Sequence, residues 1–340
     1  MASLKIGRSL IFGGTAAIVA ASATILCRRH RVTSMEGNES RPSIDELSPT
    51  LPIYIFCPTP DLQIAYDAKT KNPVYVMERL ADQPGKTKHG HKRPHFFEEK
   101  ALPEDFRSRP SHYKHSGFDR GHLAAAANWT TKGKELEFHQ TFNLCNVSPQ
   151  NHKMNCSIWS KLEYWVRKVA QEEVDSDTYV VTGPLWLPSQ RVGEKLFTYQ
   201  YSAIGSPPSL VSVPTHLFKV VAVIPKSKSK GQHHYIQKFA CFVVPNDEVD
   251  TKKEVVCLQD FLVPWSKLET VTGLVFFPGM TKDWKDQANL LTNNLLIESG
   301  RRQSPPLLLT DGSEASKKKW GRWNQNDLQL IHLCANGRCR

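Results

Sequence analysis

Short runs rich in β-branched and aromatic residues recur along most of the chain, and this pattern restricts the fold more than any other feature of the sequence. One segment between them, residues 158–171, instead carries its apolar residues at helical spacing. The pattern predicts a mixed α+β fold with a sheet core and few helices. The predicted strands lie at 53–57, 73–80, 141–147, 178–182, 196–204, 216–224, 239–244 and 273–277.

The chain of 340 residues divides by composition into a folded body and two flanking parts. Residues 32–50 are polar and contain prolines, so they are predicted to link an N-terminal segment, 1–31, to a body that spans 51–312. The C-terminal segment, 313–340, begins polar but ends with tryptophan and leucine residues. We expect it to dock on the body, because it is too apolar for a free tail.

The N-terminal segment contains one long uncharged stretch, residues 9–27. As a helix it would be roughly 28 Å long, close to the ~30 Å of a hydrocarbon core. Basic residues flank the stretch on both sides, and the first acidic residue is Glu36. This predicts a mitochondrial targeting or membrane-anchor segment, with the inner membrane or intermembrane space as location. A signal-anchor for another membrane and a cleaved secretory signal remain alternatives.

The net charge is +11, from 44 Lys and Arg against 33 Asp and Glu, and five of the excess charges lie in the first 35 residues. A moderately basic body suits a phosphate-rich partner without requiring one. The eight cysteines show no Cys-x-x-Cys pair and no metal-finger spacing. We therefore expect them to be mostly reduced thiols and not a disulfide scaffold.

The run Asp-Arg-Gly-His at 119–122 is the most informative motif. Hydrolysis of a phosphodiester needs a base that activates water, positive charge beside the phosphate oxygens, and stabilisation of the leaving oxygen. His122 supplies the base and Arg120 the charge, while a metal ion would supply the third element. Taken alone, the motif is also compatible with a turn followed by a packing segment of small residues.

Asn155 and Glu163 stand eight residues apart, near the start and the middle of the predicted helix. Two turns separate them, so they lie close to one face. An amide oxygen and a carboxylate facing a strand that bears a histidine suit Mg²⁺, which prefers oxygen ligands and keeps most of its waters. Asn151 is a competing candidate, but it lacks this spacing to Glu163.

A series of ordered sequence blocks between residues 73 and 279 resembles the DNA/RNA non-specific endonuclease family, and in particular its mitochondrial members. The resemblance implies the ββα-metal (His-metal finger) nuclease fold, with a central, mostly antiparallel sheet flanked by helices. After residue 278 it fades, apart from the pair Cys334 and Cys339. The blocks are Asp-Arg-Gly-His at 119–122, Thr-Phe-x-Leu-x-Asn-Val-x-Pro-Gln at 141–150, Asn155 with Trp159 and Glu163, and the runs 181–185, 213–220, 244–246, 261–264 and 273–278.

The resemblance also implies the catalytic roles. His122 would be the general base, and Asn155 the one direct protein ligand of a hydrated Mg²⁺, for which Mn²⁺ can substitute. Glu163 would order a metal-bound water, and Asn146 would steady the site. The expected products carry 5′-phosphate and 3′-hydroxyl ends.

Substrate binding is implied for Arg93, Arg120 and Asp119. The two arginines would contact phosphates, whereas Asp119 is expected to orient backbone or His122 more than to touch the substrate. The interval from His122 to Asn155 is slightly longer than in the family, which predicts a small insertion near 133–137.

The leading hypothesis is a mitochondrial, Mg²⁺-dependent, sugar-non-specific nuclease that degrades DNA and RNA, which it binds through phosphates. It would touch the mitochondrial membrane through residues 9–27 and form a homodimer. Release to the nucleus and a 5′–3′ exonuclease mode remain open. The alternative is a catalytically lapsed, membrane-anchored protein that binds nucleic acid, or a scaffold whose body only packs.

Overall fold

The computed structural model describes residues 48–81, 84–85, 92–192, 194–226, 236–248 and 258–280. The chain divides into two compact units, Met1–Pro52 and Ile53–Arg340, and the fold given below is that of the second. Most of the predicted segments 1–31 and 32–50, and all of 313–340, lie outside the described residues. Within the described ranges no helix is long and apolar enough to cross a bilayer.

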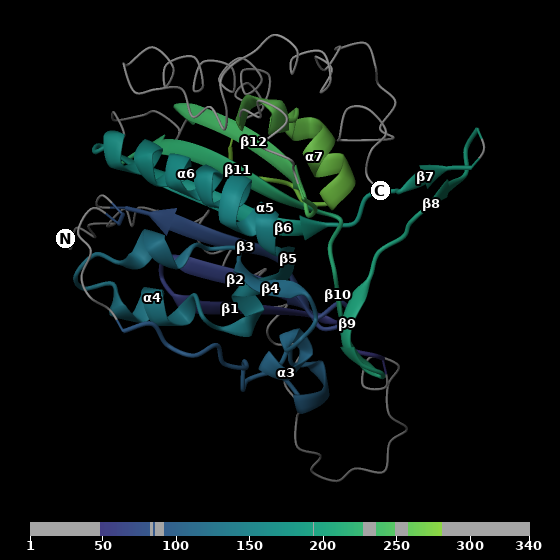
Figure 1. Ribbon diagram of the computed structural model, residues 1–340. Helices are drawn as coiled ribbons and strands as arrows, with labels where there is room; N and C mark the ends of the chain where they lie inside the picture. The colour runs from purple at the N-terminus through teal and green to yellow at the C-terminus, as the bar shows by residue number, and fades with distance from the viewer. Residues whose placement is uncertain are drawn as a thin grey trace, which may run out of the picture. The chain divides into compact units, whose positions relative to one another are not determined.

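A six-stranded sheet forms the centre of the second unit (Figure 1). Its strand order is β1-β2-β3-β6-β11-β12, and every neighbouring pair is antiparallel. The predicted α+β fold with a mostly antiparallel sheet is therefore confirmed. The strands are β1 (Ile53–Thr59), β2 (Leu62–Asp67), β3 (Asn72–Leu80), β6 (Ser176–Leu185), β11 (His216–Pro225) and β12 (Lys238–Pro245).

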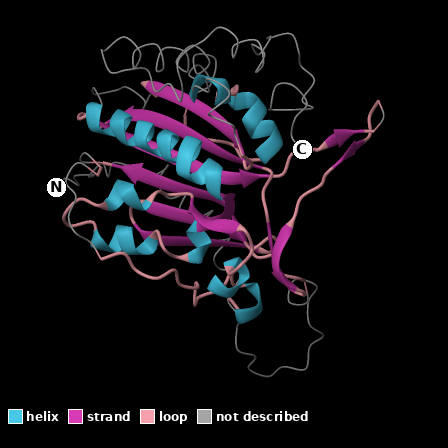
Figure 2. Ribbon diagram, in the orientation of Figure 1, coloured by secondary structure: helices cyan, strands magenta, loops and turns pink. Residues whose placement is uncertain are grey.

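Shorter elements surround this sheet (Figure 2). Three antiparallel pairs stand apart from it: β4 (Phe118–His122) with β5 (Val147–Asn151), β7 (Gln190–Arg191) with β8 (Phe197–Thr198), and β9 (Ala203–Ser206) with β10 (Ser209–Ser212). The helices are α3 (Pro110–Tyr113), α4 (Glu135–Gln140), α5 (His152–Met154), α6 (Ser160–Glu172) and α7 (Trp265–Thr272), with a π-helical turn, η4 (Asn155–Trp159), joining α5 to α6. Short 3-10 turns are η1 (Glu104–Phe106), η2 (Ala126–Trp129), η3 (Leu144–Asn146) and η5 (Leu258–Phe261).

Both faces of the sheet are buried, each in its own apolar cluster. Along β11, Leu217 and Val221 pack in the cluster that contains the buried side of α6, whereas Phe218 and Val220 pack in the cluster that contains Leu268 of α7. Alternation of side chains along a strand produces this division. Burial of each such side chain contributes about 1.5–3 kcal/mol, so the two layers hold α6 and α7 on opposite faces.

The pair β4–β5 and the helical run α5-η4-α6 form one ββα unit. Asn151 caps its helix, because the side-chain Oδ1 accepts hydrogen bonds from the backbone N–H of Lys153 (3.0 Å) and of Met154 (3.2 Å). The helical run therefore begins at His152, six residues before the predicted start of the helix at 158. The prediction missed this start because it followed apolar spacing and not the capping residue.

Two predicted strands are wrong. In 141–147, Asn143 accepts a hydrogen bond from the backbone N–H of Cys145 (2.9 Å), which stabilises a 3-10 turn, and β5 begins only at Val147. Such local side-chain bonds compete with strand pairing. In 273–277, Gly273 ends α7 with φ of 68° and turns follow it. The predicted strand 196–204 is present only in part, as β8 and the start of β9.

Gly121 allows β4 and β5 to pair at close range. A Cβ atom at this position would stand 2.0 Å from Cδ of Gln150, a fully buried residue on β5. No side chain fits there unless Gln150 moves. Since Gln150 also donates a hydrogen bond to the backbone carbonyl of His122 (3.4 Å), the glycine matters for the position of that histidine.

We expect Gly121→Ala to lower stability by about 1–3 kcal/mol, the usual cost of overpacking a buried site. Thermal unfolding monitored by circular dichroism measures the change. Gly279→Ala is the matched control, because a Cβ there meets no atom within 4 Å, and its effect should stay within about 0.5 kcal/mol. Equal melting temperatures for the two variants would contradict the close-packing argument.

Candidate active site

His122, the last residue of β4, lies between two aromatic rings. Its ring centroid is 5.2 Å from that of Phe96 and 4.9 Å from that of Phe142, which meets it edge-on at 84°. The Nε2 atom is enclosed and has no hydrogen-bond partner in the described part of the chain. Burial, aided by the charge of Arg93, lowers the pKa of His122 from 6.5 to about 4. The imidazole is therefore neutral at neutral pH and able to accept a proton.

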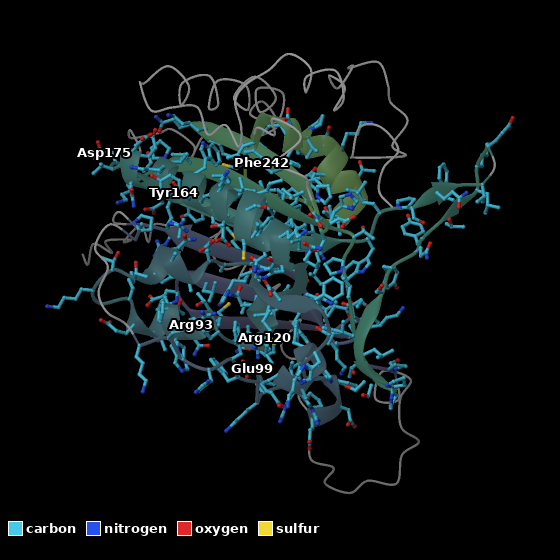
Figure 3. All side chains as sticks on the ribbon, viewed as in Figure 1. Arg93, Glu99, Arg120, Tyr164, Asp175 and Phe242 are labelled. Atoms are coloured by element: carbon cyan, nitrogen blue, oxygen red, sulfur yellow. The ribbon has the colours of Figure 1, made fainter. Side chains whose placement is uncertain are left out.

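Two exposed arginines flank this histidine through the same rings. The Arg120 guanidinium carbon lies 5.0 Å from the Phe96 centroid, and that of Arg93 lies 5.6 Å from the Phe142 centroid. The two rings are 5.2 Å apart. Figure 3 shows both arginines in the same region of the molecule. Stacking on a ring holds a guanidinium in place while its N–H donors remain available to phosphate oxygens.

Asn155 is the first residue of the π-helical turn, and Asp119 on β4 fixes its orientation. The Asn155 Nδ2 atom donates a hydrogen bond to Oδ2 of Asp119 (2.9 Å). A carboxylate oxygen only accepts hydrogen bonds, so the atom of Asn155 that faces Asp119 is the amide nitrogen, and the amide oxygen Oδ1 points away from Asp119. Asp119 Oδ2 also lies 2.9 Å from Nδ1 of His152. Asp119, expected to orient backbone or His122, thus holds Asn155 and His152 instead.

Asn146 is fully buried behind the histidine. Its side chain accepts from the backbone N–H of Ala124 (2.9 Å) and donates to the carbonyls of Ala124 (3.0 Å) and Thr141 (2.8 Å). Its backbone carbonyl accepts from the N–H of Leu123 (3.0 Å). These bonds fix the chain immediately after His122, so Asn146 positions the site without reaching solvent.

Trp159 connects β4 to the helix that carries Glu163. The indole Nε1 donates to the backbone carbonyl of His122 (3.4 Å), the same atom that Gln150 contacts. Glu163 follows one turn later on α6. Burial raises the pKa of Glu163, an effect opposed by the charges of Lys219 and Arg167 and by a hydrogen bond from Trp159.

A buried polar stripe crosses the sheet beneath these residues. Lys219 on β11 donates from Nζ to the hydroxyl of Thr182 (2.6 Å) and to the carbonyl of Leu123 (3.2 Å), and it lies 4.9 Å from the Trp159 ring centroid. Burial lowers the pKa of Lys219, whereas the carboxylates of Glu78 and Glu163 raise it. The ammonium group thereby joins the sheet to both halves of the ββα unit.

Glu78 on β3 extends the stripe toward α6. Its Oε2 accepts from Nδ2 of Asn128 (2.9 Å), whose Oδ1 in turn accepts from Nη1 of Arg167 (3.1 Å). Burial raises the pKa of Glu78 to about 7, against the opposing effects of Lys219 and of the Asn128 hydrogen bond. The helix is thus attached to the sheet through polar contacts as well as through apolar packing.

The structure brings the predicted residues into two adjoining groups. His122, Arg93 and Arg120 share the Phe96–Phe142 ring pair, and Asn155 lies with Asp119, which is also on β4. Glu163 reaches the first group through Trp159, and Asn146 supports it from the buried side.

Sequence reasoning missed Phe96, Phe142 and Lys219 as parts of the site. A signal was present only for Lys219, a lysine within the apolar run 216–224, because a buried cation needs anionic or polar partners. Phe142 lies in the block 141–150 that resembles the family, and Phe96 follows Arg93 by three residues, but the sequence does not show that their rings would stack with the two arginines.

Comparison with known proteins identifies the family of the chain. The sequence profile of the DNA/RNA non-specific endonuclease family matches residues 57–283. The Mitochondrial nuclease of Saccharomyces cerevisiae is 35% identical over 62% of this chain and 61% of its own length. Endonuclease G, mitochondrial, of Homo sapiens is 34% identical over 64% of this chain and 67% of its own. The chain thus spans about three fifths to two thirds of the length of these relatives.

A solved structure shows the same fold. A chain of the crystal structure of the EndoG/EndoGI complex superposes with a TM-score of 0.57 and 28% identity, covering 68% of this chain and 88% of that chain. The profile match contains every strand of the central sheet except the start of β1, together with the whole ββα unit. The chain therefore belongs to the DNA/RNA non-specific endonuclease family.

Proposed function

We propose that this protein hydrolyses phosphodiester bonds of DNA and RNA in a Mg²⁺-dependent reaction, leaving 5′-phosphate and 3′-hydroxyl ends. The observation that carries the proposal is a neutral, half-buried imidazole, His122, set between two ring-stacked arginines. The names of the relatives support it, since they are described as mitochondrial nucleases. The proposal assigns each part of the reaction to a named side chain.

His122 acts as the general base. Because Nε2 is enclosed, Nδ1 is the nitrogen that accepts the proton of the attacking water. The enclosed Nε2 then carries the hydrogen of the neutral ring, which defines the tautomer. The carbonyl of His122 is held by Gln150 and Trp159, so the residue keeps a fixed position as the proton moves.

The residues present fit a hydrated Mg²⁺. Asn155 Oδ1 faces away from Asp119 and has no hydrogen-bond partner in the part of the chain that the structure describes. An amide oxygen as single protein ligand, with water in the other positions, matches the preference of Mg²⁺, and Mn²⁺ can replace it. The ion supplies charge stabilisation at the phosphate and the leaving oxygen. Glu163 orders water at the site, and Asp119 keeps the amide correctly turned.

Arg93 and Arg120 bind the phosphate groups on either side of the scissile bond. Contacts to phosphates carry no base information, so cleavage is independent of sequence and of sugar, and affinity falls with salt. The exposed position of both guanidinium groups supports this role. The expected homodimer stays a prediction.

The alternative is a protein that has lost catalytic activity and only binds nucleic acid, and a cleavage assay distinguishes it from the nuclease. Cleavage of plasmid DNA and of RNA with Mg²⁺, and its loss with EDTA, supports the nuclease. Binding of both without cleavage at any concentration of Mg²⁺ or Mn²⁺ would establish the alternative.

Replacement of His122 with alanine should lower cleavage by at least about 10²-fold while DNA binding stays nearly unchanged, because only proton transfer is lost. Plasmid cleavage rates and fluorescence anisotropy of a labelled duplex measure the two effects. Wild-type turnover in this variant would remove His122 from the mechanism.

The pH profile tests the same residue independently. Since the pKa of His122 is lowered to about 4, kcat/KM should fall on the acid side near pH 4 and not near 6.5. An acid limb near 6.5 that disappears in His122→Ala would show that the imidazole is not desolvated as the structure has it.

Variants of the two asparagines at the start of the helix distinguish the proposed metal ligand, Asn155, from the helix cap, Asn151. Asn155→Ala should be nearly inactive at millimolar Mg²⁺, because it loses the ligand and the charge stabilisation together. Asn151→Ala should keep most activity and lose about 1 kcal/mol of stability, since its Oδ1 is occupied by capping. Glu163→Ala should lie between the two, because its effect passes through water.

Titration of cleavage rate with Mg²⁺ compares these three variants, and their melting temperatures separate stability from activity. If Asn151→Ala is the inactive protein, the assignment of Asn155 as ligand is wrong.

We further propose a mitochondrial location, at the inner membrane or in the intermembrane space, with residues 9–27 as anchor. The relatives named above are mitochondrial proteins by name. A fusion of residues 1–50 to a fluorescent protein should localise to mitochondria in cells, and the chain without them should be soluble and active. Appearance of the reporter in the secretory pathway would contradict this location.

A further inference from the structure

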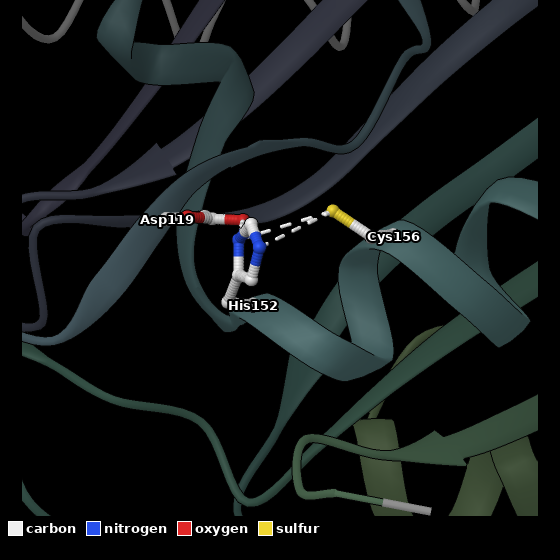
Figure 4. A group of neighbouring side chains, drawn as sticks. All are labelled: Asp119, His152 and Cys156. Carbon is white, nitrogen blue, oxygen red and sulfur yellow. Dashed lines mark hydrogen bonds and ion pairs between the residues drawn. The ribbon is translucent and has the colours of Figure 1, made fainter. Parts of the chain in front are cut away.

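A second group of side chains with metal-binding atoms lies beside the proposed active site and shares only Asp119 with it (Figure 4). His152 Nδ1 lies 2.9 Å from Asp119 Oδ2, and the Cys156 Sγ atom lies 3.8 Å from Nδ1 and 3.9 Å from Nε2 of the same ring. The ligand atoms of the three residues all lie within 4.8 Å of one another. In Figure 4 the imidazole stands between the carboxylate and the thiol.

Local structure places these side chains together. His152 is the first residue of α5, fixed there by the Asn151 cap, and Cys156 follows four residues later in η4. Residues four apart on a helix project from the same side. Asp119 comes from β4, which faces that side of the helix, as its bond to Asn155 shows. The three ligands therefore belong to two elements held in register by the ββα unit.

The set of donor atoms matches zinc. Zinc binds thiolate at about 2.3 Å, imidazole nitrogen at about 2.0–2.1 Å and carboxylate oxygen at about 2.0–2.2 Å in tetrahedral geometry. Those bond lengths place nitrogen and oxygen about 3.3 Å apart, and sulfur and nitrogen about 3.6 Å apart. The observed separations of 2.9 and 3.8 Å differ from these by a few tenths of an ångström. Small side-chain rotations close that difference.

We propose that Asp119, His152 and Cys156 bind one Zn²⁺ ion through Oδ2, Nδ1 and Sγ, with water in the fourth position. The ion enters from solvent, because the His152 side chain is 70% exposed and Cys156 is exposed as well. Binding converts the thiol to a thiolate and releases its proton to water. Mg²⁺ does not compete for this site, since it prefers oxygen ligands alone.

The zinc site and the proposed magnesium site share Asp119 but no ligand atom. Zinc would occupy Asp119 Oδ2, which accepts the hydrogen bond of Asn155 Nδ2, whereas the proposed magnesium ligand is Asn155 Oδ1. The zinc proposal does not rest on the proposed function, because ion binding is measured without nucleic acid. Failure of either proposal leaves the other standing.

Cobalt substitution tests the site through its sulfur ligand. The full chain is stripped of metal with EDTA, kept reduced, exchanged into buffer and titrated with Co²⁺. Coordination by a thiolate gives a sulfur-to-cobalt charge-transfer band in the near ultraviolet. We expect this band at one equivalent, its removal by Zn²⁺, and its persistence in millimolar Mg²⁺.

Matched variants assign the ligands. Cys156→Ser should lose the band. His152→Ala should weaken zinc binding by at least tenfold, because even the loss of a residue that only supports a ligand costs about 10–100-fold in metal affinity. Cys57→Ser removes another exposed thiol and should bind cobalt as the unmodified chain does. Because these side chains are exposed, melting temperatures of the metal-free variants should match, which separates ligand loss from unfolding.

Other outcomes overturn the proposal. A band that survives in Cys156→Ser would assign the metal to other thiols. Absence of a band in the unmodified chain, or its loss to Mg²⁺, would show that the cluster does not bind as a sulfur-containing zinc site.

Discussion

The buried ammonium of Lys219 is the interaction on which the geometry of the site depends. It lies on the face of the sheet that α6 covers, where its neighbours along β11, Leu217 and Val221, are apolar. A cation in such a place is tolerated only with partners, and here they are a hydroxyl, a backbone carbonyl and an aromatic ring. The carbonyl belongs to Leu123, next to the proposed base, and the ring belongs to Trp159 on the helix.

This arrangement explains how the sheet and the helix together fix the position of His122, the proposed base. The carbonyl contacted by Lys219 comes one residue after His122, and the Trp159 indole returns to the carbonyl of His122 itself. Lys219 therefore restrains the end of β4 from the side of the sheet, while Trp159 restrains it from the side of the helix. Burial lowers the pKa of Lys219, and the carboxylates of Glu78 and Glu163 oppose that shift. Removal of Lys219 or of one of its partners leaves a buried charge or hydrogen-bond donor unpaired, which lowers the stability of the fold by several kcal/mol.

Periodicity predicted the central sheet well, because its strands are long and their side chains alternate between two apolar layers. Six of the predicted runs coincide with strands of the structure in whole or in part, while β2, β4, β7 and β10 were not predicted. The failures at 141–147 and at 273–277 are alike, because a local feature sets the backbone conformation in each. At 141–147 it is a side-chain hydrogen bond of Asn143, and at 273–277 it is the left-handed conformation of Gly273. Strand propensity takes account of neither feature.

The sequence named those candidate residues that lie in a motif suited to the chemistry, such as His122, Arg120 and Asn155, and their roles stay proposals. The sequence could not indicate residues of a common type whose role depends on contacts with residues far away along the chain. Phe96 and Phe142 are phenylalanines without a sequence signal for binding arginine, yet their rings hold both arginines beside His122, the proposed base. The Cys156–His152 pair was likewise overlooked, because the third residue of the cluster, Asp119, is distant in sequence and was expected to orient backbone or His122.

The two strongly shifted groups of this region affect stability in opposite directions. His122 has its pKa lowered from 6.5 to about 4, so between these values the unfolded chain binds more protons and stability rises with pH. Glu78 has its pKa raised from 4.5 to about 7, so in that window the folded chain binds more protons and stability falls with pH. The two windows overlap between 4.5 and 6.5. Desolvation of His122, the proposed base, and desolvation of Glu78 therefore act on the pH dependence of folding in opposite directions across that range.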